Sequence, residues 1–193
     1  AKNLTDLKSP SSEAITIAVK ALGDENEEIR LEAIRIVEWM GKVTIKELIK
    51  QSKEGNKQLK YAATGILGRF NTEETNKHLV DLLDSGNDRV VRIAVKYLGD
   101  NKVHEAAPKL LGLAENKQNF RELIAIALFK HGYGAIVPLI QGLAKHESLK
   151  GYIFDILKKF LPNGADEIEN SIPKAPKEMQ ADLRKMVKQA LEQ

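Results

Sequence analysis

Apolar residues recur at intervals of three and four along almost the whole chain, and the strict alternation of a half-buried strand is absent. This spacing places side chains on one face of an α-helix. The longest apolar runs, such as residues 123–129, fall far short of the roughly 20 residues that a membrane span requires. The pattern therefore predicts an all-α protein.

The helical pattern also repeats with a period of about thirty residues. Six segments share one frame, and their apolar anchor residues are Ile29, Leu59, Val90, Phe120, Leu149 and Met179. Counted from each anchor, positions 0, +4, +7 and +8 are mostly apolar or small, as in Leu59, Ala63, Ile66 and Leu67. These positions are expected to face the core.

A second helix precedes each of these segments. Residues 108–114 and 138–144 share proline, glycine, leucine and alanine at equivalent positions, and Gly- or Pro-containing turns at 98–101, 131–134 and 162–164 separate the units. A unit of this size cannot bury its own apolar face, so neighbouring units must stack. We predict one domain, 1–193, built of repeats at about 11–41, 42–71, 72–102, 103–131, 132–161 and 162–193. The more polar helix of the last repeat is expected to act as a cap.

The pattern resembles the HEAT-repeat family, and in particular its short, phycobilin-lyase type of repeat. That family has a proline in the first helix and a Val-Arg-x-x-Ala-Ala-x-Ala-Leu-Gly pattern in the second. The matching residues here include Ile29-Arg30 with Ala33, Leu59-Lys60 with Ala63 and Leu67-Gly68, Val90 with Ala94 and Leu98-Gly99, and Phe120-Arg121 with Ala125 and Leu128. Residues 11–161 fit well, whereas the second helices of units five and six depart from the pattern. The resemblance implies a right-handed α-solenoid whose second helices line the concave side.

Three acidic residues each stand six positions before a basic residue, in Asp24 and Arg30, Glu54 and Lys60, and Glu115 and Arg121. In proteins similar to HEAT repeats such residues form a ladder between neighbouring repeats. The resemblance thus implies a structural role for these six charges.

Composition excludes several kinds of chemistry. The chain has no cysteine, which removes disulfides, thiolate zinc sites and cysteine nucleophiles. Charged residues make up 30% of the chain, yet the net charge is only +3, which gives no strong case for nucleic acid or a membrane surface. We expect a cytoplasmic protein without a cofactor.

Two His-Glu pairs, His104-Glu105 and His146-Glu147, raise the possibility of a metal site, because the HEAT-like enzyme deoxyhypusine hydroxylase binds iron with such pairs. The two pairs differ in phase, since His104 lies 14 residues after its anchor and His146 lies 26 after its own. No two histidines are three or four residues apart, the spacing that metal-binding helices use. Phosphate-loop and nucleophile-elbow motifs are also absent from the sequence. We therefore expect no metal site and no enzymatic activity.

The second helices offer the better candidate for a binding surface. With 100° per residue, positions +2, +6 and +9 are expected to point away from the core. The candidate partner-binding residues at these positions are Leu31, Arg35, Tyr61, Arg92, Lys96, Ile126, Phe129 and Lys158. The six second-helix segments carry a net charge of +7, against −4 for the rest of the chain, and Arg69, Lys130 and Lys159 add a basic column at +10. A shallow trough is expected at Gly65, between Leu31 and Ile126.

These features favour a non-enzymatic scaffold that binds a protein with an acidic, apolar segment along the concave face. One alternative is binding of a nucleic-acid backbone on the same basic face, although Glu38, Glu122 and Asp155 interrupt it. A second alternative, which rests on the resemblance, is a lyase-like or chaperone-type helper. The sequence gives no sign of membrane association.

Overall fold

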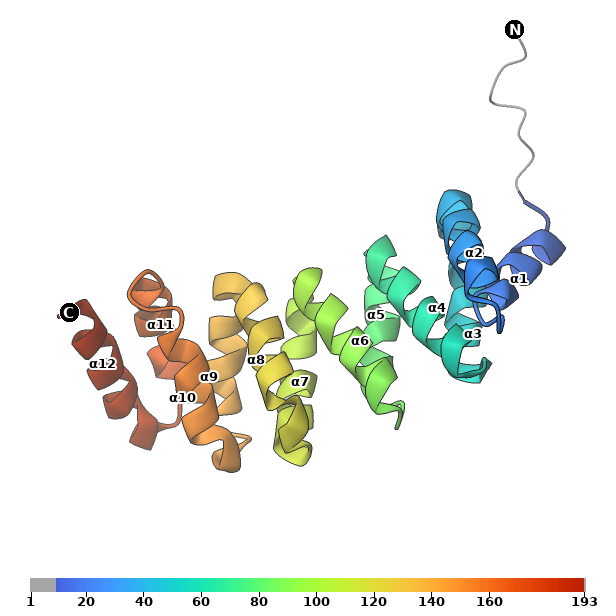
Figure 1. Ribbon diagram of the computed structural model, residues 1–193. Coiled ribbons are helices and arrows are strands. Elements are labelled where there is room, and N and C mark those ends of the chain that lie inside the picture. Colours follow the sequence, from blue (N-terminus) through green and yellow to red (C-terminus); the bar gives the residue numbers. More distant parts are fainter. Residues whose placement is uncertain (1–9, 193) are drawn as a thin grey trace, which may run out of the picture.

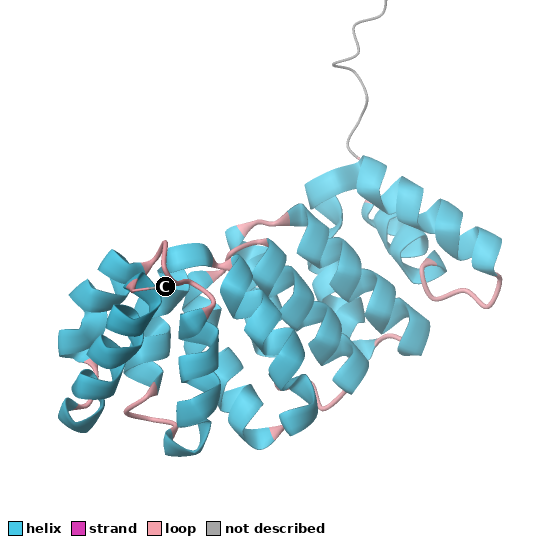
Figure 2. Cartoon of the chain, turned by 60° about the vertical axis from the view of Figure 1, so that its left-hand side comes forward, coloured by secondary structure: helices cyan, strands magenta, loops and turns pink. Residues whose placement is uncertain are grey.

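The computed structural model describes residues 10–192, and this part of the chain is helical with no strand (Figures 1 and 2). The α-helices are α1 (Ser12–Ala21), α2 (Glu27–Met40), α3 (Ile45–Glu54), α4 (Lys57–Phe70), α5 (Glu73–Leu82), α6 (Asp88–Asp100), α7 (Ala107–Asn116), α8 (Arg121–Lys130), α9 (Ile136–Gly142), α10 (Lys150–Lys158), α11 (Ala165–Ser171) and α12 (Lys177–Leu191). They form six consecutive pairs, and each of the six predicted spans contains one pair.

The pairs stack side by side in two layers. In Figure 1 the even-numbered helices α4, α6, α8 and α10 lie in front of the odd-numbered ones. Within the front layer α4 packs against α6 and α6 against α8, and within the back layer α1 packs against α3 and α7 against α9. The structure is therefore an α-solenoid, as the sequence predicted. We call the outward surface of the even-numbered helices the second-helix face.

The predicted core frame is confirmed in five of the six repeats. Leu59, Val90, Phe120, Leu149 and Met179 are all at most 5% exposed. The first repeat differs, because its anchor Ile29 is 46% exposed and Ile36, at position +7, is 39% exposed. Both were expected in the core. Among the described residues no helix packs on the outer side of the first pair, so these core positions lie open.

Five of the six second helices begin in one of two ways. Asn26, Asn56 and Asn87 cap α2, α4 and α6, and each side chain accepts a hydrogen bond from a backbone N–H in the first turn. In contrast, short 3-10 helices, Gln118–Phe120 and Glu147–Leu149, lead into α8 and α10 without a side-chain cap. As a result α2, α4 and α6 have 14, 14 and 13 residues, whereas α8 and α10 have 10 and 9.

The hydrophobic core consists of two clusters instead of one. One runs from Ala18 to Leu67 and the other from Leu79 to Val187. Five of the buried polar side chains, on α3, α4 and α5, lie where the two clusters meet; these are Gln51, Ser52, Thr64, Thr75 and His78. The solenoid therefore has a polar layer between its second and third repeats.

No helix within residues 10–192 combines the length and the apolar character needed to cross a membrane.

Candidate functional site

The eight candidate residues lie on five successive second helices. Leu31 and Arg35 are on α2, Tyr61 on α4, Arg92 and Lys96 on α6, Ile126 and Phe129 on α8, and Lys158 on α10. Seven of them are exposed, and Tyr61 is half-buried. Their role in binding a partner stays a prediction, but the structure shows which of them contact one another and which are already paired.

Leu31 and Tyr61 line one groove together. It lies between α2 and α4, has a volume of about 180 Å³, and is also lined by Ile34 and Ala62. The guanidinium of Arg89, from α6, lies 4.5 Å from the centroid of the Tyr61 ring. Tyr61 therefore connects α4 to α6 and leaves only part of its ring for a partner.

Ile126 and Phe129 form the most exposed apolar part of α8, with 46% of each residue accessible. The Phe129 ring packs against Phe160 with a centroid distance of 5.2 Å, and Phe160 contacts Tyr133 at 6.3 Å. Tyr133 is also 46% exposed. This aromatic cluster at the end of α8 holds Phe129 in place, which reduces the entropy it would lose on binding.

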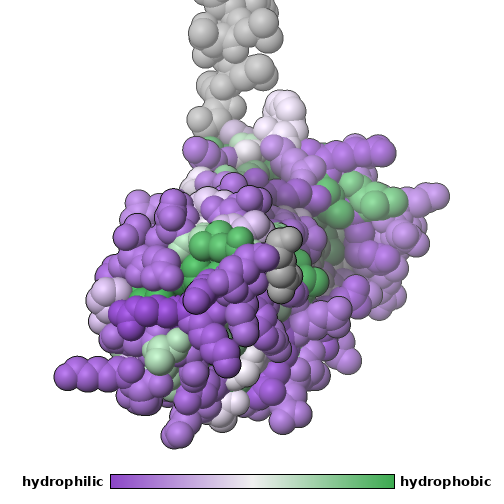
Figure 3. Space-filling view, turned by 90° about the vertical axis from the view of Figure 1, so that its left-hand side faces the viewer, coloured by the Kyte–Doolittle hydropathy of each residue, from purple (hydrophilic) through white to green (hydrophobic). Residues whose placement is uncertain are grey.

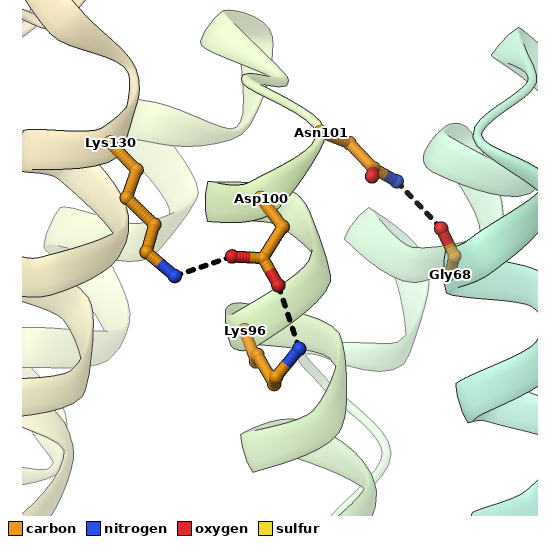
Figure 4. A network of polar contacts seen from close by, with 5 residues as sticks. All are labelled: Gly68, Lys96, Asp100, Asn101 and Lys130. Atoms are coloured by element: carbon orange, nitrogen blue, oxygen red, sulfur yellow. Dashed lines mark hydrogen bonds and ion pairs between the residues drawn. The ribbon is translucent and has the colours of Figure 1, made fainter.

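The candidate cations on α6 already have partners. Arg92 lies over the Phe120 ring at 4.7 Å. Lys96 donates a hydrogen bond of 2.7 Å to Asp100, which also accepts one from Lys130 on α8 (Figure 4). These two hydrogen bonds lower the pKa of Asp100, and the Asp100 carboxylate raises the pKa of Lys96.

Other cations on this face are paired in the same way. Arg69 Nε lies 2.9 Å from a carboxylate oxygen of Glu38 on α2, so it joins the second repeat to the first. Arg35 and Lys158 pair with acidic residues of their own helices, Glu32 at 3.1 Å and Asp155 at 3.3 Å. The +10 cations Arg69 and Lys130 therefore form contacts between repeats, which the sequence analysis had assigned to the free basic surface.

Two positions on this face have open space. A Cβ atom built on Gly65 of α4 or on Gly151 of α10 meets no atom within 4 Å. Gly68 and Gly99, at the +9 positions, have no such space. Added Cβ atoms there would lie 2.2 Å from Cγ of Tyr97 and 2.7 Å from Cα of Ala127. The expectation that +9 always points away from the core is thus wrong at these two glycines, which face the next repeat.

Residues 45–129 match the family model of HEAT repeats. This segment of the chain consists of HEAT repeats. The matched segment runs from the start of α3 through most of α8, and α9 to α12 continue the same pairwise arrangement. HEAT repeats generally mediate protein–protein interactions. No curated protein matches the sequence.

The predicted ladder of acidic and basic residues between neighbouring repeats forms at one of its six charges, since Glu115 lies 2.6 Å from His146 of the next repeat. Arg30 donates hydrogen bonds to the backbone carbonyls of Asp24 and Glu25, and Arg121 donates to that of Ala114. None of the three predicted pairs is an ion pair within residues 10–192. These arginines therefore bind backbone carbonyls at or just after the carboxyl-terminal end of the preceding helix, where the helix dipole is negative.

Other side chains link neighbouring HEAT repeats instead. Asn101 donates to the carbonyl of Gly68 at 2.9 Å (Figure 4), and His131, thirty residues later, lies 3.1 Å from the carbonyl of Leu98 through Nε2. The Tyr152 hydroxyl donates to the carbonyl of Arg121 at 2.7 Å. Sequence patterning missed this column, although Asn101 and His131 occupy equivalent repeat positions.

The histidines lie between neighbouring repeats. His146 Nδ1 is 2.6 Å from Glu115, whose pKa is lowered mainly by the hydrogen bond from Ser148. His78 Nε2 is 2.8 Å from Ser52 Oγ, and burial lowers the pKa of this histidine. No group of three or more His, Asp or Glu side chains that could hold a metal is found among the residues that the structure describes.

Proposed function

We propose that this protein is a non-enzymatic scaffold that binds a partner protein along its second-helix face. The observation that supports this most is the pair Ile126 and Phe129 on α8, because two large apolar residues remain 46% exposed on one face beside an aromatic cluster. Aromatic side chains held in place in this way are typical centres of binding energy.

The charges around this pair favour an acidic partner segment with an apolar anchor. Lys96 on α6 and Lys130 at the end of α8 share the carboxylate of Asp100. Exposed ion pairs of this kind stabilise a protein by less than about 1 kcal/mol. A carboxylate of the partner can therefore replace Asp100 at little cost, which provides specificity without a permanently unpaired charge.

The double variant Ile126→Ser/Phe129→Ser tests the proposal. Affinity capture from the source cells would identify partners of the wild type, and calorimetry with the purified partner would compare the variants. We expect the double variant to lose at least roughly tenfold in affinity, because two apolar contacts are removed. Val43→Ser is the matched control, since Val43 is 49% exposed and lies outside the second-helix face.

An unchanged affinity of the double variant, with an intact helical circular-dichroism spectrum, would overturn the proposal. A titration with a random DNA duplex at two salt concentrations tests the competing nucleic-acid function. Backbone binding loses affinity steeply as salt rises, in proportion to the phosphates contacted. The exposed carboxylates of Glu122 and Asp155, which interrupt the basic residues of this face, argue for weak binding in that experiment.

A further inference from the structure

An apolar groove lies at the amino-terminal end of the solenoid, away from the second-helix face. It runs between α1 and α2, has a volume of about 510 Å³, and is lined by Ala14, Ile17, Ala18, Ala21, Ile29, Glu32, Ala33, Ile36 and Met40. Ile17 is 70% exposed, and Ile29 and Ile36 are 46% and 39% exposed. Glu32 is the one charged residue in this lining. A continuous apolar surface of this kind marks an interaction site more often than single exposed residues do.

The second repeat shows what fits such a groove. Leu59 and Ile66 are the counterparts of Ile29 and Ile36, and they are 5% and 0% exposed. The preceding helix α1 packs against both α3 and α4, and a Cβ atom added at Gly23 would lie 2.8 Å from Leu59. In this array the groove between two paired helices is therefore filled by helices. The groove of the first repeat has the form to accept one.

The charge of the first repeat selects the kind of helix. Residues 10–41 contain seven acidic and three basic side chains, a net charge of −4, whereas residues 42–193 contain 19 acidic and 25 basic ones, a net charge of +6. Glu32 lines the groove, and Glu28 precedes it by one helical turn on α2. The surroundings of the groove thus favour a positively charged partner.

A second copy of this chain fits the groove less well. Two first repeats placed face to face would bring two charges of −4 together. Stacking the last repeat onto the first is also disfavoured, because Asp182, Lys185 and Lys188 are exposed on α12. Figure 3, which views this end, shows a largely hydrophilic surface. Neither arrangement would offer both an apolar face and positive charge.

We propose that the α1–α2 groove binds an amphipathic helix of a partner protein whose apolar face is flanked by lysine or arginine. This site is separate from the proposed second-helix site and has the opposite charge preference. A scaffold with both sites brings together two partners of different chemistry, one acidic and one basic.

Fluorescence anisotropy with two labelled peptides tests the groove. One peptide places leucines at helical spacing with lysines at the remaining positions, over about five turns or 18 residues. The other keeps the leucines and carries glutamates. We expect the wild type to bind the lysine peptide at least roughly tenfold more tightly, and we expect Ile17→Ser/Ile29→Ser to lose most of this binding.

Two further variants distinguish peptide binding in the groove from non-specific electrostatic attraction to the protein. Glu28→Gln/Glu32→Gln is expected to weaken binding of the lysine peptide and to reduce its dependence on salt. Val43→Ser is the matched control, because Val43 is 49% exposed and lines neither the α1–α2 groove nor the second-helix face. It should leave the affinity unchanged. Circular dichroism checks that every variant keeps its helices.

Four results would overturn the proposal. Equal binding of both peptides would show that charge does not select the partner. An equal loss with Val43→Ser would place the peptide elsewhere. Peptide binding that requires removal of residues 1–9, or a dimer in sedimentation experiments that Ile17→Ser/Ile29→Ser abolishes, would assign the groove to the chain itself. None of these results bears on the second-helix site, so the two proposals fail separately.

Discussion

The junction between repeats two and three differs from the junction between repeats three and four, although the same repeat positions form both. At the first, the helix α4 contributes half-buried Lys60 and fully buried Thr64; at the second, α6 contributes Val91 and Val95, at most 1% exposed. Only the second junction lies inside one continuous hydrophobic cluster. The two junctions therefore use the same repeat positions but differ in polarity, and of these two only the junction between repeats two and three is polar.

The glycines at the two junctions differ in what they touch. Gly99 would place a Cβ against the backbone of Ala127, whereas Gly68 would place it against the side chain of Tyr97. The Tyr97 ring can rotate, but the Cβ atom of Tyr97, 2.8 Å from the Cβ added at Gly68, moves only with the backbone of α6. Both junctions are therefore closely packed at their glycines.

The largest effect should come from Gly99→Ala. We expect it to lower the free energy of unfolding by about 1–3 kcal/mol, because the new methyl group must push α8 away from α6. Gly68→Ala should have a similar cost, because its methyl group must push α6 away from α4. Gly65→Ala is the control, since its methyl group meets open space and should raise helix stability by up to about 1 kcal/mol. Urea unfolding measures all three, and an unchanged stability of Gly68→Ala or Gly99→Ala would contradict the close packing at that junction.

A reciprocal exchange tests the chemistry of the junctions more directly. Val95→Thr puts a hydroxyl group into the apolar junction and should lower the free energy of unfolding by about 1–3 kcal/mol. Thr64→Val should have a smaller, stabilising effect, because the Thr64 hydroxyl donates only to the carbonyl of Lys60, one turn before it. If hydrogen exchange shows no greater protection of α3 and α4 in Thr64→Val, the polar layer does not separate two cooperative units.

The smallest effect concerns pH. Burial lowers the pKa values of His78 and His131, so the native state favours neutral rings while the unfolded chain binds protons near pH 6.5. Their stabilisation is fully present above about pH 6.5 and is lost as pH falls below it toward the lower, folded-state pKa. Urea midpoints should therefore decrease from pH 7.5 to pH 5.5.

A matched variant assigns this pH effect to one junction. His131→Asn keeps a donor for the carbonyl of Leu98, as Asn101 does for that of Gly68. His104 and Glu105 face His131 and act on its pKa in opposite directions. The variant should flatten the pH dependence while it preserves stability at pH 7.5. A slope identical to that of the wild type would remove His131 from the explanation.

Much of the fold follows from the sequence, because the thirty-residue period determines which side chain of each repeat faces its neighbours. It correctly placed Leu59, Val90 and Phe120 in the core. It failed at Ile29, since burial there depends on a helix that the period cannot supply. The period also could not predict with which groups the polar side chains form hydrogen bonds or ion pairs. Whether Arg121 hydrogen-bonds to Glu115 or to a backbone carbonyl depends on distances between side-chain and backbone atoms, which the spacing of residues along the chain does not specify.

The candidate site was predicted in outline only. The helical phase correctly predicted that Leu31, Ile126 and Phe129 are exposed. It assigned Lys130 to a basic surface column, whereas in the structure this residue pairs with Asp100, thirty residues earlier in the chain. Contacts between repeats need the rotation of each repeat relative to the next, and this rotation is a property of the packed structure.

The unequal ends of the solenoid give the array a direction in which it can be lengthened. A helix pair joined ahead of Ser12 could pack into the apolar groove between α1 and α2, where it would bury Ile17 and Ile29. A pair joined after Leu191 would instead have to cover the charged side chains of Asp182 and Lys185. Protein engineering on this scaffold should therefore add units at the amino-terminal end and retain α12 as the terminal helix.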